Sequence, residues 1–334
     1  MTGEAILSVE GLTVGIDTAE RSFLAVRDVS FDVRPGETYA IVGESGSGKS
    51  LTALSIMGLL PENAARVVAG SVRLKDEDLA TATEQRLEEI RGNRISMVFQ
   101  EPMTSLNPSM RVGRQVAEAL ELHRGMNHAE AMHEVVALFE KVRIADPERR
   151  LSEYPHRLSG GMRQRVMIAL ALACRPELII ADEPTTALDV TTQAQILKLF
   201  RDLQAEIGMA TILITHDLAV VAETAERVAV MYAGRIVEEA PSEALFAAPR
   251  HPYSLGLLQS MPRIVGHKPG ERRGRLTEIA GAVPPLWKLP VGCAYAPRCP
   301  FATERCHSER PPLAATEPGR RLACFHPVAA EAAA

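Results

Sequence analysis

The chain has 334 residues, 46% of them hydrophobic and 24% charged, and this size and balance fit a globular protein with one large domain and a smaller one. From residue 261 onward 11 Lys and Arg stand against 6 Asp and Glu, so with an overall net charge of −5 the rest of the chain carries −10, which argues against nucleic acid as the main partner. The start lacks the basic region of a secretory signal, and the longest apolar run, residues 166–174, is shorter than the ~18 residues of a membrane-spanning helix, so we expect membrane association only through a partner.

The first informative segment is GESGSGKS, residues 43–50, which matches the phosphate-loop pattern G-x-x-x-x-G-K-[ST]. It follows ETYAIV and precedes LTALSIMGLL, so the sequence predicts a strand, a glycine loop and a helix in that order. Backbone N–H groups of such a loop surround nucleotide phosphates, the lysine reaches the β- and γ-phosphates, and the final serine gives its hydroxyl to Mg²⁺. The flanking elements disfavour the alternative, a Gly- and Ser-rich turn with a chance lysine. The residues predicted to bind ATP and Mg²⁺ here are Gly43, Ser45, Gly46, Gly48, Lys49 and Ser50.

The segment LSGGMRQR, residues 158–165, places Ser159, Gly160 and Gly161 a few residues before an apolar run, which predicts a helix that begins there. A helix N-terminus is a ready anion site, although this segment taken alone fits a plain N-cap better. Cys174 lies in the apolar run and is expected to be a buried small hydrophobe.

Further along, ELIIADEP (177–184) predicts a buried strand that ends at Asp182, with Glu183 one step beyond. In an open α/β sheet this places both carboxylates at the edge where ligands bind. We expect Asp182 to hold the Mg²⁺ shell through water and Glu183 to polarise the attacking water, whereas the plainer alternative is a strand followed by an acidic turn. His216 follows the apolar run TILIT, where it is either a site residue or an ordinary surface or capping histidine.

Together these segments resemble the nucleotide-binding subunits of ABC transporters. Six motifs stand in the family order within residues 5–260: the phosphate loop, VFQEP with Gln100, LSGGM, IIADEP, ALD with Asp189, and LITHD with His216. The resemblance implies an α/β fold of the P-loop NTPase class, with a RecA-like core, an antiparallel β subdomain and a helical subdomain near residues 90–165. We therefore expect an ATPase domain over residues 1–260 and a small Cys-rich C-terminal domain over residues 261–334.

The resemblance also implies residue roles. Two such subunits sandwich ATP, so that Ser159, Gly160 and Gly161 of one close over the phosphates held by Lys49 of the other. It places Glu183, His216 and Gln100 in catalysis, with His216 at the γ-phosphate. Gln100 joins Ser50 and Asp182 around Mg²⁺ and links ATP to the membrane subunits, and Asp189 belongs to the nucleotide site.

The sequence departs from the family pattern at two points. The signature usually reads LSGGQ, but Met162 replaces the glutamine, and because the serine and the glycine amides make most of the phosphate contacts we expect activity to survive. The aromatic residue that usually stacks on adenine stays unassigned, with Phe23 and the position of Ile16 as candidates.

The amino-acid sequences of residues 99–108, 154–190 and 249–258 are similar to those of the dipeptide/oligopeptide permease branch. The likeness is closest to the D-type ATPases of bacterial dipeptide permeases. This implies an importer with two integral membrane subunits, a second and related ATPase chain, and an extracytoplasmic substrate-binding protein. It also implies that this chain lies peripherally on the cytoplasmic face of the bacterial inner membrane. Dipeptides and oligopeptides are the expected cargo, and nickel, glutathione or another small peptide-like cargo is the alternative. A soluble ATPase of translation or DNA repair is disfavoured, because the chain has one phosphate loop and no long heptad run. A regulatory, redox-sensing ATPase is a further alternative.

Four of the five cysteines cluster near the end, with the spacing Cys293-x5-Cys299-x6-Cys306-x17-Cys324. Nothing suggests export, so clustered thiols favour a metal site over disulfides. The short loops usual for zinc ribbons are absent, and Pro300 follows Cys299 as often at iron–sulfur ligands. We expect a [4Fe–4S] cluster first, Zn²⁺ second and four free thiols third, and a metal could order a segment that has little core of its own.

Overall fold

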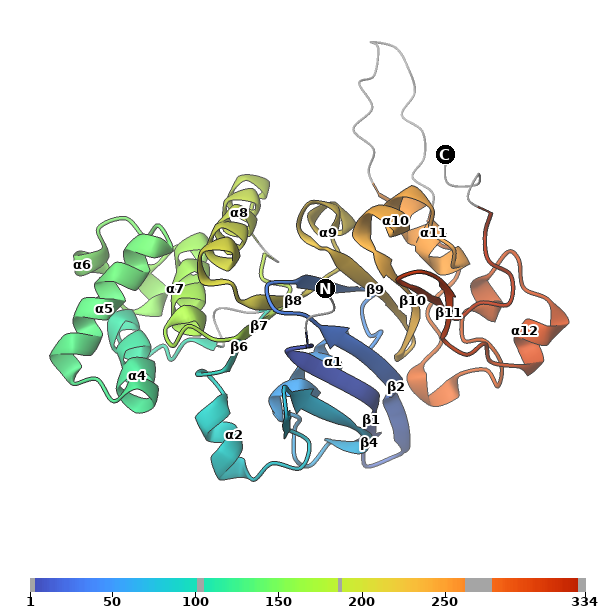
Figure 1. The fold of residues 1–334 in the computed structure, drawn as a ribbon, viewed down its shortest axis with the longest axis horizontal. Helices are drawn as coiled ribbons and strands as arrows, with labels where there is room; N and C mark the ends of the chain where they lie inside the picture. The colour runs from blue at the N-terminus through green and yellow to red at the C-terminus, as the bar shows by residue number, and fades with distance from the viewer. Residues whose placement is uncertain (1–3, 101–104, 186–187, 262–277, 330–334) are drawn as a thin grey trace, which may run out of the picture.

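The computed structural model describes residues 4–100, 105–185, 188–261 and 278–329. Figure 1 shows three regions: a helical region around α4–α7 at one end, a sheet containing β1, β2 and β4, and the C-terminal elements at the other end, all attached to a central sheet. The boundary expected at residues 260 and 261 adjoins residues 262–277, which lie outside the described residues.

The central sheet has eight strands in the order β11-β12-β10-β9-β3-β8-β7-β6. Its middle is parallel, because β3 pairs with β8 and β9, and β7 pairs with β6 and β8. These strands are short apolar runs covered on both faces, as parallel sheets require. The strand bounds are β3 (Thr38–Val42), β6 (Ile95–Val98), β7 (Leu178–Asp182), β8 (Ala210–Thr215), β9 (Arg227–Tyr232), β10 (Arg235–Pro241), β11 (Ala314–Glu317) and β12 (Arg320–Leu322).

The second sheet is antiparallel, in the order β2-β1-β4-β5. Apolar side chains that alternate along its strands, such as Leu7 and Val9, pack into one core with α1 and one face of the central sheet. The bounds are β1 (Leu7–Asp17), β2 (Ser22–Val33), β4 (Ala65–Leu74) and β5 (Glu77–Asp78), with α1 (Lys49–Met57) and α2 (Glu84–Ile90).

The opposite face of β7 carries the helical region. Leu178 and Ile180 belong to the core below the sheet, whereas Ile179 and Ala181 pack with the helices, so the two-residue period of the strand divides the two cores. The helices are α4 (Val112–Arg124), α5 (His128–Lys141), α6 (Pro147–Arg150), η1 (Pro155–Arg157), α7 (Gly160–Leu172) and α8 (Val190–Ile207). Cys174 is 3% exposed within this core, which confirms its prediction as a buried hydrophobe.

The C-terminal elements extend the central sheet. Strand β12 pairs with β10 through Glu238 with Leu322 and Glu239 with Arg321, and β11 pairs with β12. The remaining elements are α9 (Leu218–Thr224), α10 (Ser242–Ala247), α11 (Pro252–Gln259), η2 (Leu286–Lys288), η3 (Ala296–Arg298) and α12 (Glu304–Ser308). A third core joins α9, α10 and α11 to Tyr295 of this segment.

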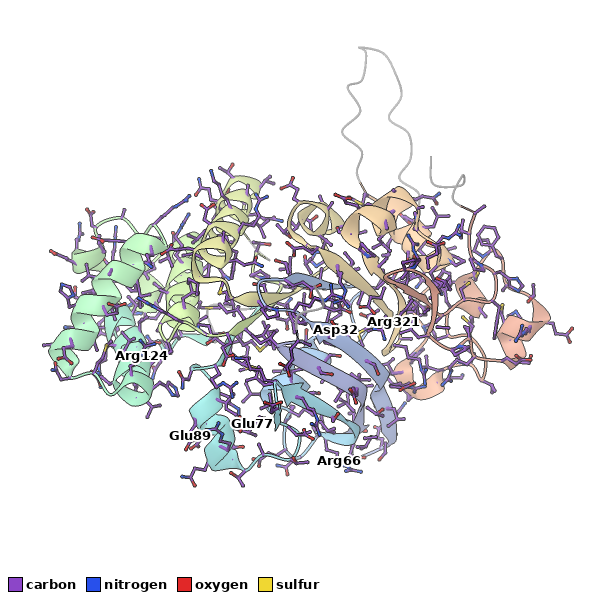
Figure 2. The ribbon with its side chains drawn as sticks, in the orientation of Figure 1. Asp32, Arg66, Glu77, Glu89, Arg124 and Arg321 are labelled. Atoms are coloured by element: carbon purple, nitrogen blue, oxygen red, sulfur yellow. The ribbon has the colours of Figure 1, made fainter. Side chains whose placement is uncertain are left out.

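Partly buried ion pairs reinforce this junction. Arg227 contacts Asp32, Glu37 and Glu239, and Arg321 contacts the same Glu239 from β12. Figure 2 shows Asp32 and Arg321 close together where the second sheet meets the C-terminal strands. Through Arg321 the C-terminal segment is thus tied to β10 of the central sheet by an ion pair, and to β2 of the second sheet by a hydrogen bond to the carbonyl oxygen of Ser30.

None of the helices in the described part of the chain is both long and apolar enough to cross a membrane.

Candidate functional site: the phosphate loop and the carboxylate edge

The phosphate loop leaves the buried strand β3 and enters α1 at Lys49, so the predicted strand, loop and helix are confirmed. Gly43, the first loop residue, has a φ of 154°, and a Cβ built on it would lie 2.1 Å from the carbonyl oxygen of Met231. Only glycine fits where the loop passes this closely over the end of β9. The loop residues from Gly43 to Ser50 therefore form one contiguous bend above the parallel strands.

Lys49 is folded across this loop. Its Nζ donates to the carbonyl oxygens of Gly43 at 2.8 Å and Glu44 at 3.1 Å, and the side chain is buried. Burial lowers the pKa of Lys49, while the carboxylates of Glu183, Asp182 and Glu44 oppose that shift. A positive charge is thus held at the centre of the loop.

Asp182 ends β7, all five residues of which are buried. The pKa of Asp182 is raised above its ordinary value, chiefly by burial and also by the charge of Glu183. A hydrogen bond from Ser50 and the charge of Lys49 partly oppose this shift. Among the residues that the structure describes, the buried Oδ1 of Asp182 is an oxygen without a hydrogen-bond partner. A hard cation such as Mg²⁺ takes oxygen ligands, so an orphaned carboxylate oxygen beside the Ser50 hydroxyl fits that ion.

The three predicted catalytic side chains meet at the carboxylate of Glu183, which Gln100 and His216 both contact. The Nε2 of Gln100 donates to its Oε2 at 2.8 Å, and the Nδ1 of His216 lies 3.2 Å from its Oε1. The three residues follow the neighbouring strands β6, β7 and β8, whose carboxyl ends meet at one edge. Glu183 also has a φ of 48°, an uncommon conformation for a residue other than glycine that often marks functional sites.

Ser159 begins α7, where its hydroxyl accepts from the N–H of Met162 at 3.4 Å, so the predicted helix start is confirmed. Asp189 caps α8 in the same way, accepting from the N–H of Thr192 at 3.0 Å. A Cβ on Gly161 would lie 2.8 Å from the Cγ2 of Thr192, so the two helix starts touch each other. Ser159 and Gly160 are exposed, and the nearest side chain to a Cβ on Gly160 is that of Leu188.

Comparisons with known proteins decide the family. A family model for ABC transporters matches residues 26–186, and a model for the C-terminal region of oligopeptide/dipeptide transporters matches residues 237–306. A Brucella ovis ATP-binding protein named for peptide import is 54% identical over 97% of this chain and 98% of its own length. The chain belongs to the ABC transporter ATPases. The oligopeptide transport ATP-binding protein AppD of Bacillus subtilis is 49% identical to this ABC ATPase over 96% of each chain.

A solved structure confirms the P-loop NTPase fold of the ABC ATPase. The dimeric structure of an ATP-binding cassette in a post-hydrolysis state, bound to ADP and Pi, matches with a TM-score of 0.63 and 31% identity. The match covers 71% of this chain and 98% of that one. The ABC ATPase is therefore an ATP hydrolase of the peptide-transport branch, with a C-terminal region beyond the shared cassette.

The four C-terminal cysteines of the ABC ATPase line one small cavity, together with His326 and other residues. Burial raises the pKa of the Cys293 and Cys299 thiols, and it raises that of Cys324 to about 11, so these thiols are neutral near pH 7. Across the described ranges, no three His, Cys, Asp or Glu side chains are gathered as a ready metal site. The iron–sulfur cluster, with Zn²⁺ as its alternative, stays a prediction.

The two candidates for the adenine-stacking position lie opposite each other, because Ile16 pairs with Phe23 across β1 and β2. Phe23 packs edge-on against Trp287 of the C-terminal segment, with ring centroids 5.7 Å apart. Trp287 is 54% exposed, and Arg21 lies 4.9 Å over its ring. Sequence reasoning missed Trp287, because nothing local relates residue 287 to β2.

Sequence reasoning also missed Tyr253. The segment PRHPYSLGLL pointed to the peptide-permease branch, but no role could be read from it. In the structure the Tyr253 hydroxyl accepts a hydrogen bond from the Glu44 N–H at 2.9 Å, and the ring is fully buried. Tyr253 therefore supports the phosphate loop from α11.

Proposed function

We propose that this chain is the ATP-hydrolysing motor subunit of a bacterial ABC importer for peptides. The observation that carries the proposal is the convergence of Lys49, Asp182, Glu183, Gln100 and His216 at one edge of the central sheet. A cationic loop, an orphaned carboxylate oxygen and a general base at one edge match the requirements of phosphoryl transfer.

The residues divide the chemistry as follows. Backbone N–H groups of the loop from Gly43 to Gly48 hold the phosphates, and Lys49 neutralises their charge. Ser50, Asp182 and Gln100 hold Mg²⁺, which when bound offsets charge on the β- and γ-phosphates. Glu183 accepts a proton from the attacking water, kept in place by its hydrogen bond with Gln100. The Nδ1 of His216 contacts the other carboxylate oxygen of Glu183, and from this position the ring can contact the γ-phosphate.

The proposal includes a second ATPase subunit. Ser159, Gly160 and Gly161 begin α7, and the first two are exposed, which suits an anion site that acts on another molecule. In the dimer these residues close over the phosphates held by Lys49 of the partner, with Asp189 beside them at the start of α8. ATP binding closes the pair, and hydrolysis with phosphate release reopens it.

Closure and reopening would move two integral membrane subunits through the helical region, near residues 90–165. The second ATPase would be a related but distinct chain, and an extracytoplasmic substrate-binding protein would deliver the cargo. This assembly places the chain on the cytoplasmic face of the inner membrane. The names of the relatives support peptides as cargo rather than nickel or glutathione.

Replacing Lys49 with Ala is expected to weaken ATP binding itself. The buried ammonium is the positive charge at the centre of the loop, so we expect the Kd for Mg-ATP to rise at least about tenfold. Titration with a fluorescent ATP analogue measures this, and Lys75→Ala, which removes an exposed lysine, is the control. Equal Kd values for both variants would refute the role given to Lys49.

We also propose that residues 261–334 form a small C-terminal domain beyond an ATPase domain of residues 1–260, and that its four cysteines hold a [4Fe–4S] cluster. Four thiolates suit such a cluster, with Zn²⁺ second, and the four thiols line one cavity. Because burial raises the pKa of Cys293, Cys299 and Cys324, binding of the cluster would release protons from these three thiols.

Protein purified without oxygen is expected to contain about four iron and four sulfide per chain. Cys299→Ser should lose them, whereas Cys174→Ser, which alters a cysteine buried in the helical core, should keep them. Iron, acid-labile sulfide and zinc analysis measures the outcome. Absence of all three from the unaltered protein would overturn the metal site, and zinc alone would replace the cluster by its alternative.

A further inference from the structure

One side chain that lies among the clustered C-terminal cysteines reaches the phosphate loop. Arg298 lies at the end of η3, between Cys293 and Cys299, and its two terminal nitrogens donate to both carboxylate oxygens of Glu44, at 2.7 and 3.0 Å. Glu44 is the second residue of the phosphate loop. The side chain of Arg298 is only 4% exposed and that of Glu44 is 27% exposed, so this is a partly buried bidentate ion pair between segments 254 residues apart.

The rest of the guanidinium is fixed by neighbours. Its Nε donates to the carbonyl oxygen of Ala280 at 2.9 Å, and its carbon lies 5.8 Å from the ring centroid of Tyr232 and 5.9 Å from that of Tyr295. Tyr253 packs on both tyrosines, at centroid distances of 4.6 and 5.4 Å. Because the Tyr253 hydroxyl accepts from the Glu44 N–H, this cluster holds both the backbone and the side chain of Glu44.

The pair also decides the charge that the loop presents. The Glu44 carbonyl accepts from Lys49, and Asp182 and Glu183 already place two carboxylates near that ammonium. A third, unpaired carboxylate at Glu44 would repel the phosphates of ATP and draw Lys49 away from them. Arg298 cancels this charge and fixes its position.

We propose that Arg298 is a positioning residue for ATP binding, through which the C-terminal segment sets the charge and shape of the phosphate loop. The inference rests on the proposed function of the loop as an ATP site. If Arg298 has this role, residues 279–299 contribute to the nucleotide site as well as packing against the central sheet.

The test is a titration of the full-length chain with a fluorescent ATP analogue in the presence of Mg²⁺. Arg298→Gln is expected to raise the Kd roughly tenfold, since it leaves Glu44 charged and unpaired beside the phosphates. The double variant Arg298→Gln with Glu44→Gln removes both charges, and its Kd should return to within about threefold of the unaltered chain. Arg298→Lys, which keeps the charge but not the two-pronged geometry, should lie between.

Arg321→Gln is the matched control. It breaks another ion pair between the C-terminal segment and the sheet, with Glu239, and leaves the phosphate loop untouched. Both single variants are expected to lower the melting temperature of the nucleotide-free protein, but only Arg298→Gln should change the Kd for ATP.

A Kd for Arg298→Gln within twofold of the unaltered chain would overturn the proposal, as would a double variant that binds ATP more weakly than Arg298→Gln. If the unaltered chain itself fails to bind the analogue, the proposed function fails. If that chain binds and Lys49→Ala does not, an unchanged Kd for Arg298→Gln removes this inference alone.

Discussion

Glu183→Gln is expected to lower the rate of ATP hydrolysis by a factor of about 10² to 10⁴ while ATP still binds, because general-base catalysis typically contributes that much. The amide keeps the size of the side chain and a hydrogen-bonding oxygen for Gln100, but it cannot accept the proton of the attacking water. Phosphate release from the purified transporter complex measures the rate, and titration with a fluorescent nucleotide measures binding.

Glu153→Gln provides the control for this substitution. Glu153 pairs with Arg150 in the helical region and is as little exposed as Glu183, at 16%, but it lies away from the carboxylate edge. Its replacement should leave turnover within about twofold of normal, as for a substitution outside the site. Unchanged ATPase activity in the Glu183 variant would contradict the role that we give to this carboxylate.

Arg320→Met is expected to reduce the free energy of unfolding by about 3 to 5 kcal/mol, because removing one partner of a buried ion pair leaves the other charge uncompensated. Arg320 is 4% exposed and pairs with Glu238, which is fully buried. The same guanidinium donates to the carbonyl oxygens of Ala244 and Ala248, so it also ties β12 to α10 and the residue that follows it.

Denaturation by urea, followed by fluorescence and by proteolysis of the C-terminal segment, measures this loss. Arg305→Gln is the control, because Arg305 and Glu309 form an exposed pair four residues apart that should contribute only about 0.3 to 0.5 kcal/mol. Equal midpoints for the two variants would show that the Arg320–Glu238 pair does not hold the segment in place.

The features most readily predicted from the sequence are those that depend on consecutive residues. The phosphate loop carries its glycines, lysine and serine within eight positions. The end of β7 is marked in the sequence by the change from apolar residues to Asp182. The meeting of Gln100, Glu183 and His216 was also within reach. Each follows a predicted strand or a family motif, and the carboxyl ends of adjacent parallel strands share one edge.

Pairings between distant segments could not be predicted in this way. The contact of Arg298 with Glu44 and the addition of β12 to β10 depend on how the C-terminal segment returns to the sheet, and no local period encodes that path. The cysteine spacing indicated a shared site, and the four thiols do line one cavity, but spacing does not fix how closely the sulfur atoms approach.

The most direct measurement for the account as a whole is uptake of a labelled dipeptide by cells that carry either the native chain or Glu183→Gln, with equal amounts of each protein in the membrane fraction. We expect uptake to be lost in the variant, because the chain supplies the motor of a peptide importer. Equal uptake by both strains, repeated with longer peptides and with Ni²⁺, would contradict the assignment of this chain as that motor.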